Sequence, residues 1–271
     1  MVLTYIDVNK DIWSGLGLGM INNFWERFIK LFTKTILYVW YIRWFWKPEE
    51  GSINEILNRA AKRDPEFTFV QIGANDGYHN DPLYKFIRAY NWNGIMVEPQ
   101  VHVFERLKKN HKGNDVLKFE NAAISAEKGV IPFYMLAVST ARWATGMSSF
   151  DQKHIEEHID IGFVKKWATR EGITLPENRE DYIKCVEVQT MNFDDLIAKH
   201  GLNDVDGIIL DCEGFDSMVL STVDIPGYNP DIILFEHLHF KDEDYQELTD
   251  RLSDLGYELR SDEMDTIAFK R

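Results

Sequence analysis

The chain of 271 residues has few cysteines, little basic charge and no long apolar run. Its two cysteines, Cys185 and Cys212, cannot form the disulfide framework of a small secreted protein, so we expect a reducing, cytoplasmic location. The formal net charge of −14 argues against a nucleic-acid partner, because a general nucleic-acid binder needs a basic surface. The N-terminus lacks a basic segment followed by an apolar one, and we therefore expect no signal peptide.

Residues 1–47 differ from the rest of the chain, because they carry six basic and three acidic side chains and five of the eight tryptophans. Apolar side chains recur there at helical spacing, with charged side chains opposite, which predicts an amphipathic helix. The apolar face comprises Ile21, Phe24, Trp25, Phe28, Phe32, Ile36 and Trp40, and the charged face Glu26, Arg27, Lys30 and Lys34. The longest uncharged run after Glu26 is eight residues, which is too short to span a membrane.

Three interpretations of this extension are open, and we place its boundary with the main domain between residues 50 and 51. The helix could pack on its own domain or on a second copy of the chain as a homodimer. It could instead lie in a membrane interface as a peripheral contact, where its basic and aromatic side chains suit the lipid headgroups. The third interpretation is a lid over an active site. We favour packing or dimerisation.

Residues 51–271 are expected to form one α/β domain around a mostly parallel sheet. The clearest strand is 67–72, whose nearly continuous apolar run suits the middle of such a sheet. It breaks into a turn between Gly73 and Gly77, and Asp81-Pro82 is a helix-start signal. Strand, glycine turn and helix together let a backbone approach a nucleotide closely, although a turn without a ligand has the same pattern.

An acid follows the second predicted strand. This strand begins at Gly94 and ends in Glu98 and Pro99, 21 residues beyond Gly77. In nucleotide-binding α/β folds an acid at this place accepts hydrogen bonds from the ribose hydroxyls. Hydrogen bonds to a charged acceptor contribute about 1.5–3 kcal/mol each, so a single carboxylate can fix the sugar. We therefore prefer this interpretation of Glu98 to an exposed strand-end carboxylate.

Two later strands also end in polar, titratable side chains. They are Asp211 and Glu213 after the strand 207–210, and Glu236 and His237 after the strand 231–235. Side chains at the carboxyl ends of parallel strands point into the crevice where ligands bind. Two such endings beside a nucleotide crevice predict a catalytic or metal site rather than two capped strand ends.

A polar and charged segment, about residues 145–182, separates two predicted strands at 129–135 and 185–191. A single helix is predicted over 152–170, and we interpret the segment as a cover over the substrate that interrupts the sheet. His154 and His158 lie four residues apart on this helix, a spacing that suits a metal site. Because no accompanying acid-and-histidine signature is present, we favour solvated helix histidines.

Six short motifs, in order along the chain, resemble the FkbM family of S-adenosylmethionine-dependent methyltransferases. They are Val70 to Gly77 (VQIGANDG), Val97 to Pro99 (VEP), Asn121 to Ser125 (NAAIS), Met147 to Phe150 (MSSF), Val188 to Asp195 (VQTMNFDD) and Leu210 to Asp216 (LDCEGFD). The likeness runs from about Phe67 to His237. It implies a class I methyltransferase fold, Rossmann-like and mostly parallel. The strands at 257–260 and 265–270 are then its C-terminal antiparallel hairpin.

The resemblance implies S-adenosylmethionine as the cofactor. The positions that match the family's cofactor-binding motifs are Gln71, Gly73, Ala74, Asn75, Gly77, Glu98, Pro99, Asn121 and Ala122. In the resembled family the loop of Asn121 and Ala122 lies against the adenine. One departure is Gln71, because class I methyltransferases often carry an acid there, and this weakens any assignment for the cofactor's amino group.

The resemblance also implies an O-methyltransferase whose acceptor is a hydroxyl of a sugar, glycolipid or secondary metabolite. A hydroxyl is a poor nucleophile until a base draws its proton away. The available groups are Asp211, Glu213, Glu236, His237 and His239. We favour His237, because histidine titrates nearest neutrality, with Asp211 second. Asp211, Glu236 and His237 could instead ligate a divalent cation that lowers the hydroxyl pKa, and the sequence does not decide between the two mechanisms.

Two functions of other classes stay open at this point. One is a nicotinamide-dependent oxidoreductase, although the glycine turn lacks the G-x-G-x-x-G spacing of such enzymes. The other is a non-catalytic scaffold that uses the aromatic N-terminus to recruit partners.

Overall fold

The computed structural model describes residues 29–271 and divides the chain into two compact units, one ending at Trp46 and the other spanning Lys47–Arg271. In the first unit, a helical stretch at 29–32 precedes α3 (Ile36–Trp44), whose N-cap is Thr35. The helix predicted to run without a break as far as Trp40 is therefore interrupted at 33–35, and its residues 21–28 lie outside the described part. No helix in the described residues is long and apolar enough to cross a membrane.

The second unit is built on a seven-stranded sheet in the order β3-β2-β1-β7-β8-β10-β9. Five neighbouring strands are parallel: β3 (Leu117–Glu120), β2 (Asn93–Val97), β1 (Thr68–Ile72), β7 (Gly207–Leu210) and β8 (Ile232–Glu236). The last two strands along the chain, β9 (Glu258–Ser261) and β10 (Asp265–Phe269), pair antiparallel, and β10 also pairs antiparallel with β8. The predicted class I methyltransferase sheet with its C-terminal hairpin is confirmed.

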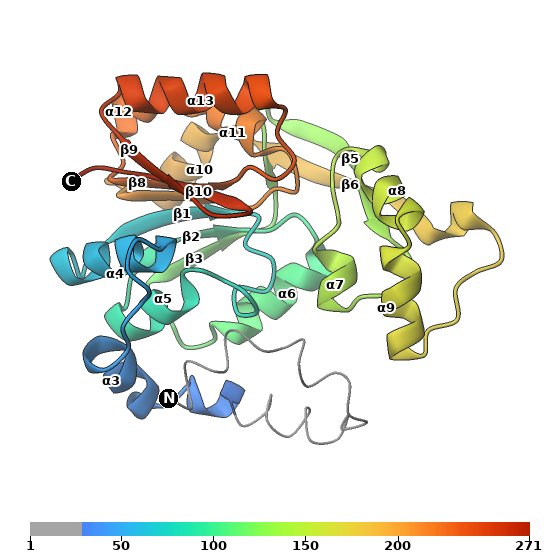
Figure 1. Cartoon of the computed structure of the whole chain (residues 1–271), viewed down its shortest axis with the longest axis horizontal. Helices are drawn as coiled ribbons and strands as arrows, with labels where there is room; N and C mark the ends of the chain where they lie inside the picture. Colours follow the sequence, from blue (N-terminus) through green and yellow to red (C-terminus); the bar gives the residue numbers. More distant parts are fainter. Residues whose placement is uncertain (1–28) are drawn as a thin grey trace. The chain divides into compact units, whose positions relative to one another are not determined.

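Helices cover both faces of this sheet (Figure 1). On one face lie α10 (Phe193–His200), α11 (Asp216–Thr222), α12 (Ile225–Tyr228) and α13 (Asp242–Asp254). On the other face lie α4 (Ile53–Arg63), α5 (Tyr84–Tyr90) and α6 (Val101–Asn110). α4 is capped at its start by Ser52, whose Oγ accepts the backbone N–H of Glu55. The helix predicted from Pro82 begins two residues later, at Tyr84, and the Asp81 carboxylate still accepts the N–H groups at its start.

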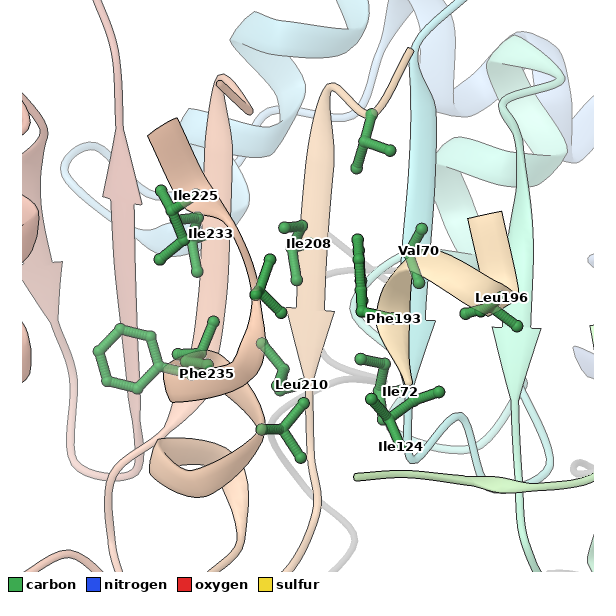
Figure 2. Packing of buried hydrophobic residues seen from close by; sticks show 14 of the residues in the cluster. Val70, Ile72, Ile124, Phe193, Leu196, Ile208, Leu210, Ile225, Ile233 and Phe235 are labelled. Carbon is green, nitrogen blue, oxygen red and sulfur yellow. The ribbon is translucent and has the colours of Figure 1, made fainter. Parts of the chain in front are cut away.

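The main core lies between the sheet and helices α10 to α13. Alternate residues of each parallel strand point to this face, because side chains of a strand alternate between its two sides. Figure 2 shows them in one layer with side chains from α10 and α12: Val70, Ile72, Ile208, Leu210, Ile233 and Phe235 from the strands, and Phe193, Leu196 and Ile225 from the helices. Burying each such side chain contributes about 1.5–3 kcal/mol, so this layer holds the strands and the helices together.

The opposite face is held by stacked aromatic rings. Trp92 is fully buried, and its ring centroid lies 4.3 Å from that of Phe67 and 5.3 Å from that of Phe86. Aromatic pairs at such distances add about 0.5–1.5 kcal/mol beyond the area that they bury. These rings join α5 to the residues that directly precede β1 and β2.

A second sheet stands beside the first, with three strands in the order β4-β6-β5. They are β4 (Ala123–Ile124), β6 (Ile183–Met191) and β5 (Gly129–Leu136). The predicted cover lies between β5 and β6, at one end of the main sheet (Figure 1), and so does not interrupt that sheet. It contains α7 (Arg142–Thr145), α8 (Gln152–Asp160), α9 (Phe163–Glu171) and a 3-10 turn (Arg179–Tyr182). The single helix predicted over 152–170 is two helices, because Gly162 adopts a left-handed φ of 78° between them.

Candidate active site

A cleft opens beyond the carboxyl ends of β1, β2 and β7, with a volume of about 560 Å³ that includes space open to solvent. Parallel α/β sheets bind ligands at this edge. The main sheet contributes Gly73, Asn75, Glu98, Pro99, Asp211 and Glu213 to its lining. The second sheet adds Ala122 and Phe133, and the cover adds Ser148 and Phe150. The cleft is therefore enclosed between the main domain and the segment predicted to cover the substrate.

The turn after β1 brings backbone into this cleft. Gly73 has a φ of 77°, and a Cβ at this position would lie 1.9 Å from the carbonyl oxygen of Asp211. Asn75 also adopts a left-handed φ, of 46°, and directs its backbone N–H at Glu98. Gly77 has a φ of 61°, and a Cβ there would lie 2.4 Å from a side chain, that of Leu107, and not from backbone. The glycines of the turn are thus required by packing.

Glu98 is buried, with 3% of its surface exposed, at the wall of the cleft. One carboxylate oxygen accepts the backbone N–H of Asn75 at 3.0 Å, and the other accepts that of Gln100 at 2.8 Å. Burial raises the pKa of Glu98 to about 7, although these two bonds and the positive charge of Arg142 lower it. Each oxygen keeps a second lone pair, so the carboxylate can still accept a hydroxyl from a ligand.

Asn121 supports this wall from behind. Its side-chain amide donates to the carbonyl oxygens of Glu98 at 2.8 Å and of Pro99 at 3.0 Å. Ala122, the next residue, lines the cleft. Of the two residues predicted beside the adenine, Asn121 therefore holds the turn in place and Ala122 offers the surface.

Two acids after β7 lie at the cleft. Asp211 is an exposed residue in the lining of the cleft. Desolvation by the surrounding protein raises the pKa of its carboxyl, whereas the positive charge of Arg142 lowers it. Burial, and then the nearby Asp211 charge, raise the pKa of Glu213 to about 8. Glu213 adopts a left-handed φ of 49°, which is uncommon for a residue other than glycine. The two carboxylates repel one another, and a bound cation would relieve that repulsion.

Two further acids lie behind this pair. The Asp216 carboxylate accepts the backbone N–H groups of Cys212 at 3.0 Å and Glu236 at 3.3 Å, and burial raises its pKa to about 8. Glu236 is 7% exposed, and its Oε2 has no hydrogen-bond partner. Burial, followed by the charges of Glu213, Asp211 and Asp216, raises the pKa of Glu236 to about 9. These side chains form a largely protonated layer at neutral pH.

The structure brings some of the predicted site residues together in one cleft. Gly73, Asn75, Glu98, Pro99, Ala122, Asp211 and Glu213 line one cleft, whereas Gln71, Ala74, Gly77, Asn121, Glu236 and His237 are not part of its lining. Gln71 donates instead to the Asp81 carboxylate at 2.9 Å. His237 lies against β10 and α13, with its Nδ1 3.0 Å from Thr266 Oγ1 and its ring 5.0 Å from that of Tyr245.

The family model described as "Methyltransferase FkbM domain" matches residues 71–259. The chain belongs to the FkbM methyltransferase family. The resemblance in the six motifs is thereby confirmed, and S-adenosylmethionine is the cofactor of this FkbM methyltransferase. Methyl transfer is accordingly favoured over the nicotinamide-dependent alternative. No curated protein matches the chain.

Solved methyltransferase structures are similar to this FkbM methyltransferase at low identity. An FkbM methyltransferase from Methylobacillus flagellatus KT is 13% identical with a TM-score of 0.45, and the match covers 87% of this chain and 58% of that one. An S-adenosylhomocysteine-bound methyltransferase from Podospora anserina is 10% identical with a TM-score of 0.39, and the match covers 87% of each chain. Aeropyrum pernix fibrillarin with natively bound S-adenosylmethionine is 10% identical with a TM-score of 0.36, covering 76% and 66%.

The residues of the cleft fit this cofactor. Ala122, Ile124 and Phe133 give an apolar wall suited to a flat purine, and the Glu98 carboxylate lies in the same cleft with lone pairs to spare. A positively charged sulfonium beside Asp211 and Glu213 would favour the charged forms of both side chains, whose mutual repulsion raises the pKa of Glu213.

Some residues of the cleft were not predicted from the sequence. Gln100 donates from its side-chain amide to the Thr145 carbonyl at 2.9 Å and accepts the Ser148 hydroxyl at 3.2 Å. It therefore ties the Glu98 turn to the cover. Ser148 lies in the MSSF motif, so the family resemblance pointed to its segment, whereas a glutamine after Glu-Pro carries no signal of its own.

Side chains that could ligate a metal lie close together, but they are not the three that were predicted. Within residues 29–271, the group of three whose ligand atoms all lie within 4.8 Å of one another is His154, Glu213 and His239, and not Asp211, Glu236 and His237. Burial lowers the pKa of His154. Burial, and then repulsion by His154 and His158, lower that of His239 to about 4. The two imidazoles of the group are therefore neutral at neutral pH.

Proposed function

We propose that this FkbM methyltransferase transfers a methyl group to a hydroxyl of a sugar, glycolipid or secondary metabolite, with Asp211 as the base. The observation that carries the proposal is the position of Asp211 at the end of β7, where its carboxylate is exposed in the cleft that also contains Glu98. A base must lie within hydrogen-bond reach of the hydroxyl that it deprotonates. Asp211 satisfies this condition for an acceptor seated in the cleft.

Bound S-adenosylmethionine supplies a methyl group that its sulfonium has already activated. Glu98 accepts the ribose hydroxyls through the lone pairs that its two backbone hydrogen bonds leave free. Ala122 and Phe133, which line the same cleft, would hold the adenine. The chain's task is then to hold the acceptor oxygen in line with the carbon–sulfur bond and to exclude water.

The base proposed here differs from the one that the sequence favoured. His237 has the more suitable side chain by type, but its ring packs on Tyr245 and bonds to Thr266, outside the residues that line the cleft. Asp211 was the second candidate and lies in the lining. In the reaction the acceptor oxygen would take the methyl group while its proton passes to the Asp211 carboxylate, and the carbon–sulfur bond would break to leave S-adenosylhomocysteine.

A hydroxyl acceptor is supported by the polar part of the cleft. Ser148 and Gln100 form a hydrogen-bonded pair in its lining, next to the cover helices. Such groups bind hydroxyls, and the cover is placed where it can bind the rest of a polar acceptor.

Methyl transfer with ¹³C-methyl-labelled S-adenosylmethionine tests the proposal. The full chain would be incubated with a panel of free sugars, alkyl glycosides and polyhydroxylated aromatic compounds, and the product examined by NMR. We expect a labelled O-methyl group on a hydroxyl compound. Asp211→Asn should lower kcat by about 10²–10⁴-fold. Asp254→Asn, on the outer helix α13, should leave it unchanged.

Two results would contradict the proposal. A labelled methyl group on nitrogen or carbon would overturn the hydroxyl acceptor. Unchanged kcat in Asp211→Asn would overturn the choice of base, and a loss confined to His237→Ala would return that role to the histidine.

A further inference from the structure

We propose that His154, Glu213 and His239 bind a divalent transition-metal ion at the acceptor side of the cleft. The three residues come from separate elements: His154 from α8 of the cover, Glu213 from the loop after β7, and His239 from the loop after β8. Their ligand atoms lie within 4.8 Å of one another. The site joins the cover to the main domain.

The spacing suits a single ion. Two ligand atoms that are each about 2.1 Å from one tetrahedral ion lie about 3.4 Å apart. His154 Nε2 and Glu213 Oε2 are 3.5 Å apart, close to that value. At this distance the pair makes a poor hydrogen bond, yet each atom has room to coordinate an ion between them.

One imidazole nitrogen of His154 also lacks a partner. His154 is 8% exposed, and its Nε2 is buried without a hydrogen-bond partner. Buried polar atoms in native proteins are normally paired, so an orphaned nitrogen directed at a carboxylate calls for an explanation. A metal ion bonded to Nε2 supplies the missing partner.

The neighbouring residues hold the ligands in place. His158 Nδ1 lies 2.8 Å from the His154 carbonyl oxygen and can donate to it, and the His158 ring is 4.7 Å from that of His154. Ser149 donates its hydroxyl to the Glu213 carbonyl oxygen at 3.2 Å. Glu213 is also held at a left-handed φ of 49°, and strained backbone persists where the surroundings enforce it, often at functional sites.

The ligand set indicates the class of ion. Two imidazoles and one carboxylate suit Zn²⁺, Fe²⁺, Co²⁺ or Mn²⁺, whereas Mg²⁺ and Ca²⁺ prefer oxygen ligands throughout. Three protein ligands leave coordination positions open. Because Glu213 belongs both to this group and to the cleft lining, an open position would face the acceptor.

The role of the ion in the reaction, which is to activate the acceptor hydroxyl, rests on the proposed function. An acceptor hydroxyl that coordinates the metal loses its proton more readily, and Asp211, two residues before Glu213, receives that proton. Binding of the metal itself does not depend on the reaction.

The test is a titration of the full chain with Co²⁺ after treatment with EDTA. We expect one Co²⁺ per chain, with the intense visible absorption of a four- or five-coordinate site, and Zn²⁺ should displace it. Co²⁺ taken up without a defined stoichiometry and without saturation, as exposed surface carboxylates would bind it, would overturn the site. This measurement on the unmodified chain needs no variant.

Matched variants locate the site. His154→Gln, His239→Gln and Glu213→Gln should each weaken Co²⁺ binding by at least about tenfold. Glu171→Gln, an exposed carboxylate on α9, and His102→Gln, on α6, should bind as the unmodified chain does. Ligand variants that melt cooperatively and bind Co²⁺ like these controls would contradict the assignment.

Calorimetric titration of S-adenosylhomocysteine into the same proteins separates the two proposals. We expect His154→Gln and His239→Gln to retain its binding, because neither residue lines the cleft. Cofactor binding without Co²⁺ binding would overturn the metal site alone. Co²⁺ binding without cofactor binding would overturn the proposed reaction and leave the metal site standing.

Discussion

The α-carbon of Gly73 faces the carbonyl oxygen of Asp211 so closely that a Cβ at position 73 would lie 1.9 Å from that oxygen. The two residues follow the paired strands β1 and β7, and the Asp211 backbone N–H donates to Ile72 at 3.1 Å. The turn that lines the cleft is thus also the joint between two central strand ends. Cofactor binding and stability are therefore coupled at this position.

Gly73→Ala should destabilise the whole domain, and not only block the cofactor. The added methyl group meets backbone, which cannot rotate away, so we expect a loss of about 1–3 kcal/mol or more in the free energy of unfolding. Urea denaturation measures it. Gly172→Ala is the matched control, because Gly172 has a similar φ of 68° with nothing within 4 Å of the added Cβ. Equal losses in the two variants would show that the strained φ, and not the contact with Asp211, sets the cost.

The buried acids predict that stability falls as the pH rises. Glu236 has a pKa of about 9 in the folded chain, against the ordinary value of 4.5 for a glutamate, so the folded state holds more protons between these values. Stability from this group is full below about pH 4.5 and is lost as the pH rises through about 9. Each extra bound proton gives a slope of about 1.4 kcal/mol per pH unit. Glu98 and Asp216, with pKa values of about 7 and 8, act in the same direction.

Glu236→Gln should flatten this dependence, because an amide of the same shape cannot ionise. The measurement is thermal or urea denaturation from pH 5 to pH 9 in EDTA. We expect the variant to be more stable than the unmodified chain near pH 9. Glu66→Gln removes an exposed carboxylate and is the control. Parallel curves for all three proteins would contradict the buried-charge explanation.

His237→Ala should change kcat far less than the loss of about 10²–10⁴-fold expected of a general base. The reason is that His237 contacts Thr266 and Tyr245 outside the cleft lining. Thr266→Val removes the same hydrogen bond without touching the imidazole and should give a similar, small change. Steady-state kinetics on both variants, with cofactor affinity measured in parallel, makes the comparison. A large fall in kcat for His237→Ala alone would show that the histidine takes part in the reaction.

The N-terminal unit allows a test of the packing, dimer and membrane hypotheses. Trp40 and Trp44 of α3 are 57% and 71% exposed, which leaves apolar surface for a partner. We predict a concentration-dependent dimer in analytical ultracentrifugation. We also predict no sedimentation of the full chain with anionic liposomes at low salt. Liposome binding that disappears in high salt would instead indicate an interfacial helix, whose attraction to the lipid is electrostatic.

Much of the fold could be predicted from the sequence, because its strongest signals are local. The apolar run of β1, the acid after β2 and the helix-start signal at Asp81 each depend on a few consecutive residues. The break of the cover helix at Gly162 was missed, since an isolated glycine is tolerated inside many helices.

The candidate site was harder to predict than the fold. His237 stands at a correctly predicted strand end, but tertiary packing turns its ring toward β10. His154, Glu213 and His239 are brought together only by the docking of the cover on the main domain, which no sequence spacing encodes. Residues that converge from three elements carry no common pattern along the chain.

Calorimetric titration of S-adenosylhomocysteine into the full chain and into Glu98→Gln tests the central claim most directly. The glutamine keeps an acceptor for one of the two backbone N–H groups, those of Asn75 and Gln100, and places its amide NH2 at the other, whereas alanine would leave both unpaired. Glu120→Gln, at the last residue of the neighbouring strand β3, is the control, because Glu120 bonds to Lys199 and His200 and does not line the cleft. We predict binding to the unmodified chain and to Glu120→Gln, and an affinity at least about tenfold weaker in Glu98→Gln. No binding to the unmodified chain, or equal affinity in all three proteins, would contradict the assignment of this cleft to the cofactor.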